Sequence, residues 1–194
     1  MWKRLKSKKG NVTTLWLAGL PMFALLMLAL ISMLTAWLSH SSMQVAADAA
    51  SLAATKKMDK LVQDEINDRI ARVIESNQYR PVDEQIIDPY YYVVGTKRKK
   101  ERLIRYVINH HQSELIAEVK KYVKKNGASS EGVITFFVNG RIEVEARTPY
   151  SPALFEEELS EQFKDAYVKG RGTGPTRDYM KWITSKNKIK VSYD

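Results

Sequence analysis

The feature of this sequence that most constrains its fold is an uncharged, strongly apolar run over residues 15–38. A helix rises about 1.5 Å per residue, so a run of this length crosses a hydrocarbon core of about 30 Å with some tilt. A buried helix of a soluble protein is the weaker interpretation, because so small a chain could hardly cover it. A cleaved secretory signal is also weaker, since its apolar region spans only about 7–15 residues and ends at small residues, whereas Trp37, Leu38 and His40 stand here. We therefore predict an uncleaved transmembrane helix at residues 15–38.

The charges around this run predict its orientation. Five cations and no acid precede it, within residues 1–14. Such tails are poorly translocated, so we expect this tail in the cytoplasm and residues 79–194 outside it, as an extracytoplasmic domain. Trp16 and Trp37 lie near the two ends of the run, where amphipathic rings favour the headgroup zone. The prediction is a single-pass protein of the cell membrane with a cytoplasmic N-terminus.

Charge and cysteine content exclude several classes of function. The formal net charge is +9, but five of the 31 basic residues lie in the tail, which leaves 26 against 22 acidic residues. The remainder is only mildly basic, which does not indicate a nucleic-acid-binding protein. The chain has no cysteine, which excludes disulfides, a thiol nucleophile and thiolate metal ligands.

Residues 39–78 predict a helical spine that continues directly from the membrane segment. No Gly or Pro occurs between Ser39 and Ser76, and the first part is rich in alanine, the best helix former. An apolar stripe then recurs at three- and four-residue steps. Its members are Leu61, Val62, Ile66, Ile70, Val73 and Ile74.

A basic Gly-Asn junction at residues 8–11 precedes the apolar span, and an alanine-rich stretch around Asp48 follows it. In these features, roughly residues 8–56 resemble the TadE/TadG-like proteins of tight-adherence (Flp-type) pilus assembly. This resemblance implies a minor pilin-like envelope protein of a type II/type IV secretion-like system. It also implies a processing site between Gly10 and Asn11. Pilin-like members carry Glu five residues after the cleaved Gly, and Leu15 stands there, so we expect retention at full length.

Small residues in the alanine-rich stretch predict a helix-packing surface, because they let another backbone approach closely. The candidate packing residues are Ala46, Asp48, Ala49, Ala50 and Ala53. Three interpretations of Asp48 stay open. It is a solvated helix residue above the headgroups, a hydrogen-bond acceptor for a neighbouring pilin-like subunit, or a partner of lipid-side cations.

The rest of the chain predicts an α+β domain. Residues 86–95 are aromatic and β-branched and favour a loop followed by a short strand. One helix is expected from residue 97 to the Asn126-Gly127 stop signal, with its apolar face at Leu103, Ile104, Val107, Ile108, His111, Leu115, Val119 and Tyr122. A further short helix is expected from Leu154, Leu159, Phe163 and Tyr167, and a strand from Ile189, Val191 and Tyr193.

An Asn139-Gly140 pair between two β-like runs predicts an antiparallel hairpin. A two-residue turn pairs Val138 with Arg141 and places Phe137 opposite Ile142. The predicted buried face also holds the pairs Thr135 with Val144 and Val133 with Ala146.

No pattern of catalytic residues emerges. Adjacent helix residues point about 100° apart, so His110 and His111 are unsuited to one metal. Glu143 and Glu145 indicate a solvated strand face. Residues 169–175 alternate cations with glycines but lack the Walker ending, which favours a flexible surface loop able to touch anionic wall polymers or lipid headgroups. We therefore expect that the protein is not an enzyme and that it has no cofactor and no metal site.

Two functions stay open at this point. The first is a membrane-anchored pilin-like structural component of a Flp-type pilus or secretion apparatus, in contact with other pilin-like or platform subunits. The alternative is a single-span anchored extracellular binding or sensor module unrelated to pili.

Overall fold

The computed structural model describes residues 12–129, 131–150, 166–183 and 188–194. The chain divides into two compact units. The N-terminal unit comprises residues 1–39 and 150–166, and the sheet unit comprises residues 40–149 and 167–194.

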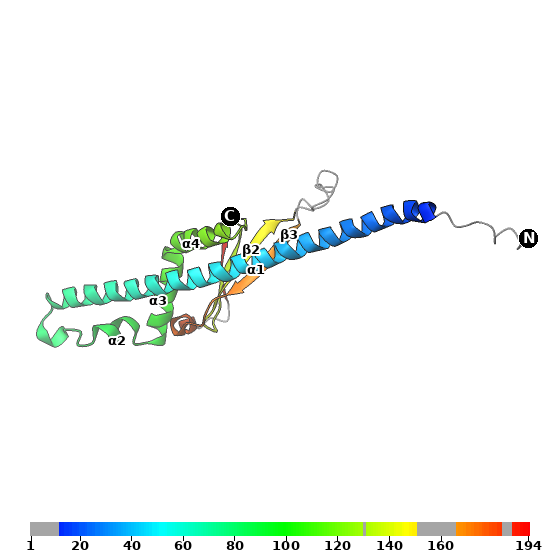
Figure 1. Cartoon of the computed structure of the whole chain (residues 1–194). Coiled ribbons are helices and arrows are strands. Elements are labelled where there is room, and N and C mark those ends of the chain that lie inside the picture. The colour runs from blue at the N-terminus through cyan, green and yellow to red at the C-terminus, as the bar shows by residue number, and fades with distance from the viewer. Residues whose placement is uncertain (1–11, 130, 151–165, 184–187) are drawn as a thin grey trace, which may run out of the picture. The chain divides into compact units, whose positions relative to one another are not determined.

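The first helix, α1 (Val12–Asn77), is continuous over 66 residues (Figure 1). This confirms the prediction that the apolar helix continues into a long helical spine. Asn77 then turns the chain, because its side chain donates to the Ile86 carbonyl (2.9 Å) and accepts from the Ile86 amide (3.0 Å). A short 3-10 helix, η1 (Val82–Glu84), lies in the loop that follows.

The predicted strand in residues 86–95 is wrong, because the chain forms a short helix there, α2 (Pro89–Val94). Pro89 stands in its first turn, and the Asp88 side chain caps it by accepting from the Tyr91 amide at 2.9 Å. Val93 and Val94 are buried. A good N-terminal cap and a buried face therefore outweigh the β-propensity of this segment.

The predicted single helix after residue 97 is two helices, α3 (Lys97–His110) and α4 (Gln112–Lys125). The break falls at His111, whose backbone has φ −104° and ψ 22°. Its ring Nδ1 lies 2.8 Å from the Glu114 carboxylate. Apolar positions keep helical spacing across this break, so periodicity alone could not show it. Gly127, with φ +79°, ends α4 as expected.

Four antiparallel strands form one sheet in the order β3-β2-β1-β4. The strands are β1 (Gly132–Phe136), β2 (Ile142–Pro149), β3 (Tyr167–Thr173) and β4 (Ile189–Tyr193). A second 3-10 helix, η2 (Asp178–Trp182), lies between β3 and β4. The hairpin and the C-terminal strand are thus confirmed, whereas the loop expected at residues 169–175 is mostly strand β3. Of the residues that predicted another helix, Leu154, Leu159 and Phe163 lie outside the described residues, and Tyr167 begins β3.

The predicted hairpin register is wrong by one residue. Phe136, not Phe137, pairs with Ile142. The Phe137 amide donates to the Arg141 carbonyl at 2.9 Å, and Gly140 has φ +92°, so three residues form the loop instead of two. This is the three-residue hairpin that ends with a left-handed glycine.

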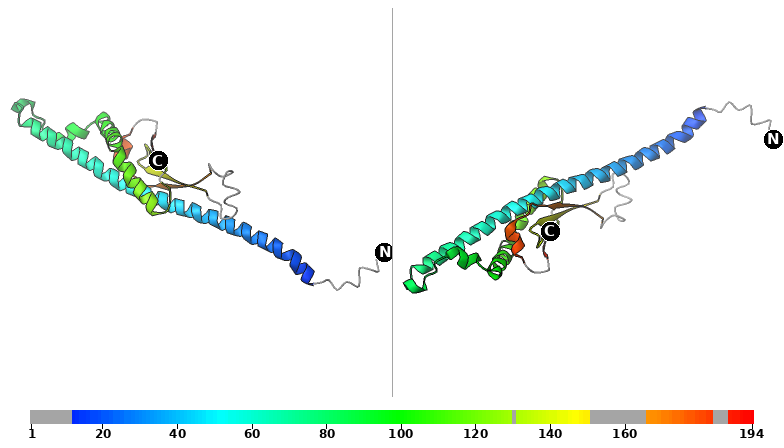
Figure 2. Two further views of the ribbon diagram at one scale, coloured as in Figure 1. Left: turned by 90° about the horizontal axis from the view of Figure 1, so that it is seen from above. Right: turned by 90° about the horizontal axis from the view of Figure 1, so that it is seen from below.

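The one-residue shift changes which β1 side chains are buried. Ile134 and Phe136 are fully buried opposite Val144 and Ile142, while Val133 is only half-buried. The sheet therefore has one apolar face, which joins the core with α1, α3 and α4. Figure 2 shows the shorter helices and the sheet along the sheet unit's part of α1.

Candidate functional site on the first helix

The N-terminal unit exposes an apolar helical segment. Among the described residues, one helix is long and apolar enough to span a membrane, and its most apolar 18-residue window has a mean hydropathy of 2.3. No residue of that window is buried within the protein. Trp16, Leu17 and Met22 are each more than two-thirds exposed. So large an uncovered apolar surface suits a lipid environment better than water.

The hydroxyl groups in this segment are satisfied inside the helix. Ser32 donates to the Leu28 carbonyl at 3.1 Å, and Thr35 donates to the Ile31 carbonyl at 2.7 Å. Such bonds to the preceding turn let Ser and Thr lie in an apolar environment without an unpaired hydroxyl. The two side chains are therefore compatible with a membrane-spanning helix.

Beyond His40, the same helix buries one face in its own sheet unit. Between residues 43 and 55 nearly all the buried side chains are small, and we call these residues the small-residue face. Its members are Ala46, Ala47, Ala50, Ser51, Ala53, Ala54 and Thr55. Because these side chains are short, the element that covers this face can lie close to the α1 backbone.

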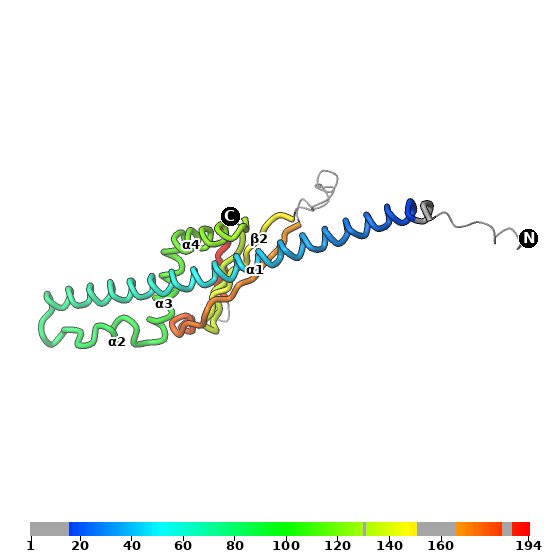
Figure 3. The backbone as a smooth tube through the Cα atoms, viewed as in Figure 1, coloured from blue at the N-terminus to red at the C-terminus, as the bar shows by residue number. Residues whose placement is uncertain are grey.

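Strand β3 covers the small-residue face with glycines. A Cβ on Gly170 would come closer than 3.0 Å to the Met43 carbonyl group, and one on Gly172 would do the same at Ala47. Two residues advance about 6.7 Å along a strand, and four residues advance about 6.0 Å along a helix. Alternate strand residues therefore meet successive helical turns, and only glycine fits. Figure 3 shows the path of β3 beside α1.

Gln44 binds the backbone at the outer side of β3. Its amide nitrogen donates to the Arg171 carbonyl at 2.7 Å, and its amide oxygen accepts from the Arg171 N–H at 3.3 Å. One side chain thus satisfies both backbone groups of Arg171, a residue on an edge strand of the sheet. This protects β3 from pairing with another strand at that point.

The predicted packing residues divide between two faces of α1. Ala46, Ala50 and Ala53 are buried within the sheet unit. Ala49 is half-buried and Asp48 is exposed, with one carboxylate oxygen 3.4 Å from the Gln44 amide nitrogen. Contact of this region with a second subunit stays a prediction. Gly10 and Asn11 lie outside the described residues.

The predicted loop cations are on β3, and the structure gives one of them a partner. Arg171 contacts the Glu145 carboxylate at 3.1 Å, and Arg147 contacts it at 2.8 Å. Partial burial opposes ionisation of Glu145, but the hydrogen bonds and charges of these two arginines lower its pKa below the usual value. The Glu145 carboxylate therefore forms ion pairs with both arginines on the polar face of the sheet.

Sequence reasoning missed an ion-pair cluster that ties α1 to the C-terminal region. Arg177 contacts both carboxylate oxygens of Asp59 at 2.9 Å, and the Tyr179 hydroxyl donates to Asp59 at 2.6 Å. Burial and then the Asp59 carboxylate raise the pKa of Tyr179 above its ordinary value. No local motif signals this cluster, because Asp59 lies more than 100 residues before Arg177 and Tyr179.

The comparisons with known proteins agree with this geometry. Residues 10–57 match the family model described as "Putative Flp pilus-assembly TadE/G-like". The matched region contains the apolar segment and the small-residue face. No curated protein and no solved structure matches the chain significantly.

Proposed function

We propose that this chain, TadE/TadG-like over residues 10–57, is a membrane-anchored, pilin-like structural component of a Flp-type pilus or a related type II/IV secretion-like apparatus. The proposed role is structural and not enzymatic. Residues 15–38 span the cell membrane, residues 1–14 lie in the cytoplasm, and the sheet unit lies outside. One observation carries this proposal: an uncovered apolar helix continues without a break into a helix that is built into a folded unit.

The outward side of α1 gives this component a surface for neighbouring subunits. Val45 and Leu52 are exposed, at 56% and 58%, beside exposed Asp48 and half-buried Ala49. These positions are three or four residues apart, so they share one side of the helix. The sheet unit's own β3 covers the opposite side. We therefore assign contacts with other pilin-like or platform subunits to the Val45–Leu52 side.

The test is gene deletion in the source organism, followed by counting surface pili by electron microscopy. We expect loss or strong reduction of pili, restored by the parent gene. A Leu25→Arg variant should not restore them, because a cation at the centre of a span costs about 3 kcal/mol of insertion free energy. A Leu103→Ala variant keeps the apolar segment but loses a buried side chain of the sheet unit. It is therefore the control for an effect of lower stability alone. Unchanged pili in the deletion strain would contradict the proposal.

Topology is tested separately with protease on intact, wall-stripped cells. We expect digestion of the sheet unit, because the cationic tail favours a cytoplasmic N-terminus. Protection of the sheet unit until the cells are opened would contradict the proposed orientation. A second candidate function, an anchored extracellular binding module, is favoured by a cavity in the sheet unit whose lining includes Arg69, Arg72, Arg80, Lys99 and Arg102.

A further inference from the structure

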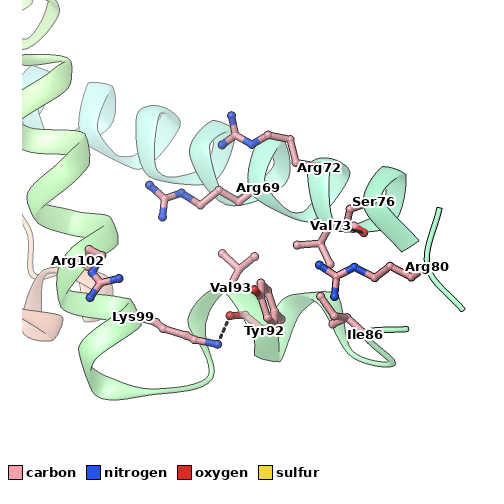
Figure 4. Close-up of a pocket in the computed structure, with 10 residues that line it drawn as sticks. All are labelled: Arg69, Arg72, Val73, Ser76, Arg80, Ile86, Tyr92, Val93, Lys99 and Arg102. Atoms are coloured by element: carbon pink, nitrogen blue, oxygen red, sulfur yellow. Dashed lines mark hydrogen bonds between the residues drawn. The ribbon is translucent and has the colours of Figure 1, made fainter. Parts of the chain in front are cut away.

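A cavity of about 390 Å³ lies within the sheet unit, where the end of α1 faces α2 and the start of α3. Its ten lining residues come from four consecutive parts of the fold (Figure 4). They are Arg69, Arg72, Val73, Ser76, Arg80, Ile86, Tyr92, Val93, Lys99 and Arg102. Half of them are cationic and none is acidic.

The cavity has an apolar floor and a cationic rim. Val73 and Val93 are buried, and Figure 4 shows them pointing toward one another from α1 and α2. The cations come from several sides of the cavity (Figure 4). Arg69 and Arg72 extend from α1, Arg72 on the side of the helix away from Val93. Lys99 and Arg102 come from α3, and Arg80 points toward Val73. Such a site can hold an anion on its rim and a small apolar part of the same ligand on its floor.

Carboxylates of the protein neutralise little of this charge. Arg69 contacts Glu65 at 2.6 Å, while Arg72 is 3.7 Å from the same carboxylate. Lys99 donates to the Tyr92 carbonyl and lies 4.3 Å from the centre of the Tyr92 ring. Within the described part of the chain, the guanidinium groups of Arg80 and Arg102 have no ion-pair or hydrogen-bond partner.

The excess charge favours a ligand that carries several negative charges in a small volume. Guanidinium groups bind carboxylate and phosphate oxygens in a paired geometry. A phosphate group offers up to two charges and three or more acceptor oxygens, whereas a carboxylate offers one charge. Phosphate therefore compensates the rim with fewer groups, and a cavity of this volume admits few groups.

We propose that this cavity binds a phosphate-bearing anion. The phosphate lies on the cationic rim, and an attached apolar or ring-shaped part lies on the floor against Val73 and Tyr92. Two sources carry this chemistry: a small phosphate monoester with up to two charges on one group, or an anionic phosphodiester polymer of the cell envelope, in which neighbouring repeats supply one charge each. This inference rests on the proposed extracytoplasmic location only for the choice between sources.

The test is calorimetric titration of the full-length protein in nanodiscs of zwitterionic lipid, with three probes. Inorganic pyrophosphate represents a small phosphate anion, poly(glycerol phosphate) an envelope polymer, and polyglutamate an acidic peptide. The proposal requires saturable binding of at least one phosphate probe, weakened by added salt. Pyrophosphate binding alone identifies a small ester, and tighter binding of the polymer identifies the polymer. Absence of saturable phosphate binding, or tighter binding of polyglutamate, would overturn it.

Two double variants show whether the cavity is the site. Arg80→Gln with Arg102→Gln removes the two unpartnered cations of the rim. Lys97→Gln with Arg98→Gln removes two exposed cations that do not line the cavity. We expect the first pair to raise the Kd of the phosphate probe by about tenfold and the second by less than about twofold, since charge-assisted bonds form only at the rim. Equal losses would indicate non-specific surface charge and overturn the proposal. If the deletion strain has normal pili but phosphate binding still depends on the cavity residues, the proposed pilus function is contradicted and the phosphate site is not.

Discussion

Two successive parts of α1 pack against the rest of the sheet unit in different ways. Residues 43–55 present small side chains to the glycines of β3, so that two backbones lie in direct contact. Residues 58–73 present Met58, Leu61, Val62 and Ile66 to the core of the sheet unit. The same helical spacing of buried positions thus serves contact between backbones in one part and interdigitated side chains in the other.

This difference determines which amino-acid substitutions each part tolerates. Where backbones touch, no atom can be added, because neither backbone can move without disrupting its own hydrogen bonds. Where side chains interdigitate, a change of shape at constant volume costs little, and a loss of volume leaves a cavity.

The largest effect is expected from added side chains on β3. Gly170→Val with Gly172→Val should lower the free energy of unfolding by about 5 kcal/mol, because each added side chain overpacks the contact with α1. This is enough to unfold a domain of ordinary stability. The control is Lys169→Val with Thr173→Val, at exposed positions of the same strand. Chemical denaturation followed by Trp fluorescence checks both, and equal midpoints would contradict backbone contact.

In the second part of α1, volume should matter more than shape. Met58 is fully buried. Met58→Ala should lower the free energy of unfolding by about 3 kcal/mol through the cavity it leaves, whereas Met58→Leu should cost less than about 1.5 kcal/mol. The same denaturation assay measures both. A Leu variant as unstable as the Ala variant would mean that this part is as intolerant of shape as the small-residue face.

Loss of the Gln44 side chain should have an intermediate effect. Gln44→Ala removes two hydrogen bonds to Arg171 and should cost about 1–2 kcal/mol. It should also speed hydrogen exchange of the Arg171 amide. Gln63→Ala is the matched control, because Gln63 is exposed on the same helix and its side chain donates to the Asn67 side chain at 3.0 Å. Equal exchange rates in both variants would show that Gln44 does not protect the strand.

The smallest effect concerns pH. A hydrogen bond from Lys57, and then one from His111, lower the pKa of Glu114 from 4.5 to about 2. Because the folded-state pKa is the lower one, the contribution of Glu114 to stability is present above about pH 4.5 and is lost as the pH falls toward 2. Glu114 is exposed, so we expect its contribution to the free energy of unfolding to be less than about 1 kcal/mol. Glu114→Gln should flatten this part of the stability-pH curve, and an unchanged slope would contradict the assignment.

The sequence predicted the elements whose signals are local. The apolar span, the spine, the hairpin and the last strand all follow from periodicity or turn residues. The hairpin register failed because Asn139-Gly140 fits both a two-residue and a three-residue loop. Strand β3 was missed because its glycines also mark loops.

The partner of the small-residue face could not be predicted, for a physical reason. Gln44 and Arg171 are 127 residues apart, and an alanine-rich helix face fits a glycine-bearing strand as well as another helix. The cation-lined cavity has the same origin, since Arg102 comes to line the same cavity as Arg72 and Arg80 only after the chain turns back beyond Asn77. Local patterns predict that a face is buried, but only the tertiary fold shows what buries it.

Cysteine accessibility tests most directly whether the chain's own sheet covers the small-residue face. The chain has no cysteine of its own, so Ser51→Cys and Leu52→Cys each introduce a single thiol. Ser51 is 1% exposed and Leu52 is 58% exposed. In dilute purified protein in detergent, a maleimide should modify the thiol at 52 rapidly and the thiol at 51 only after denaturant is added. Equal, rapid modification of both would contradict the account, because the small-residue face would then be open to another subunit.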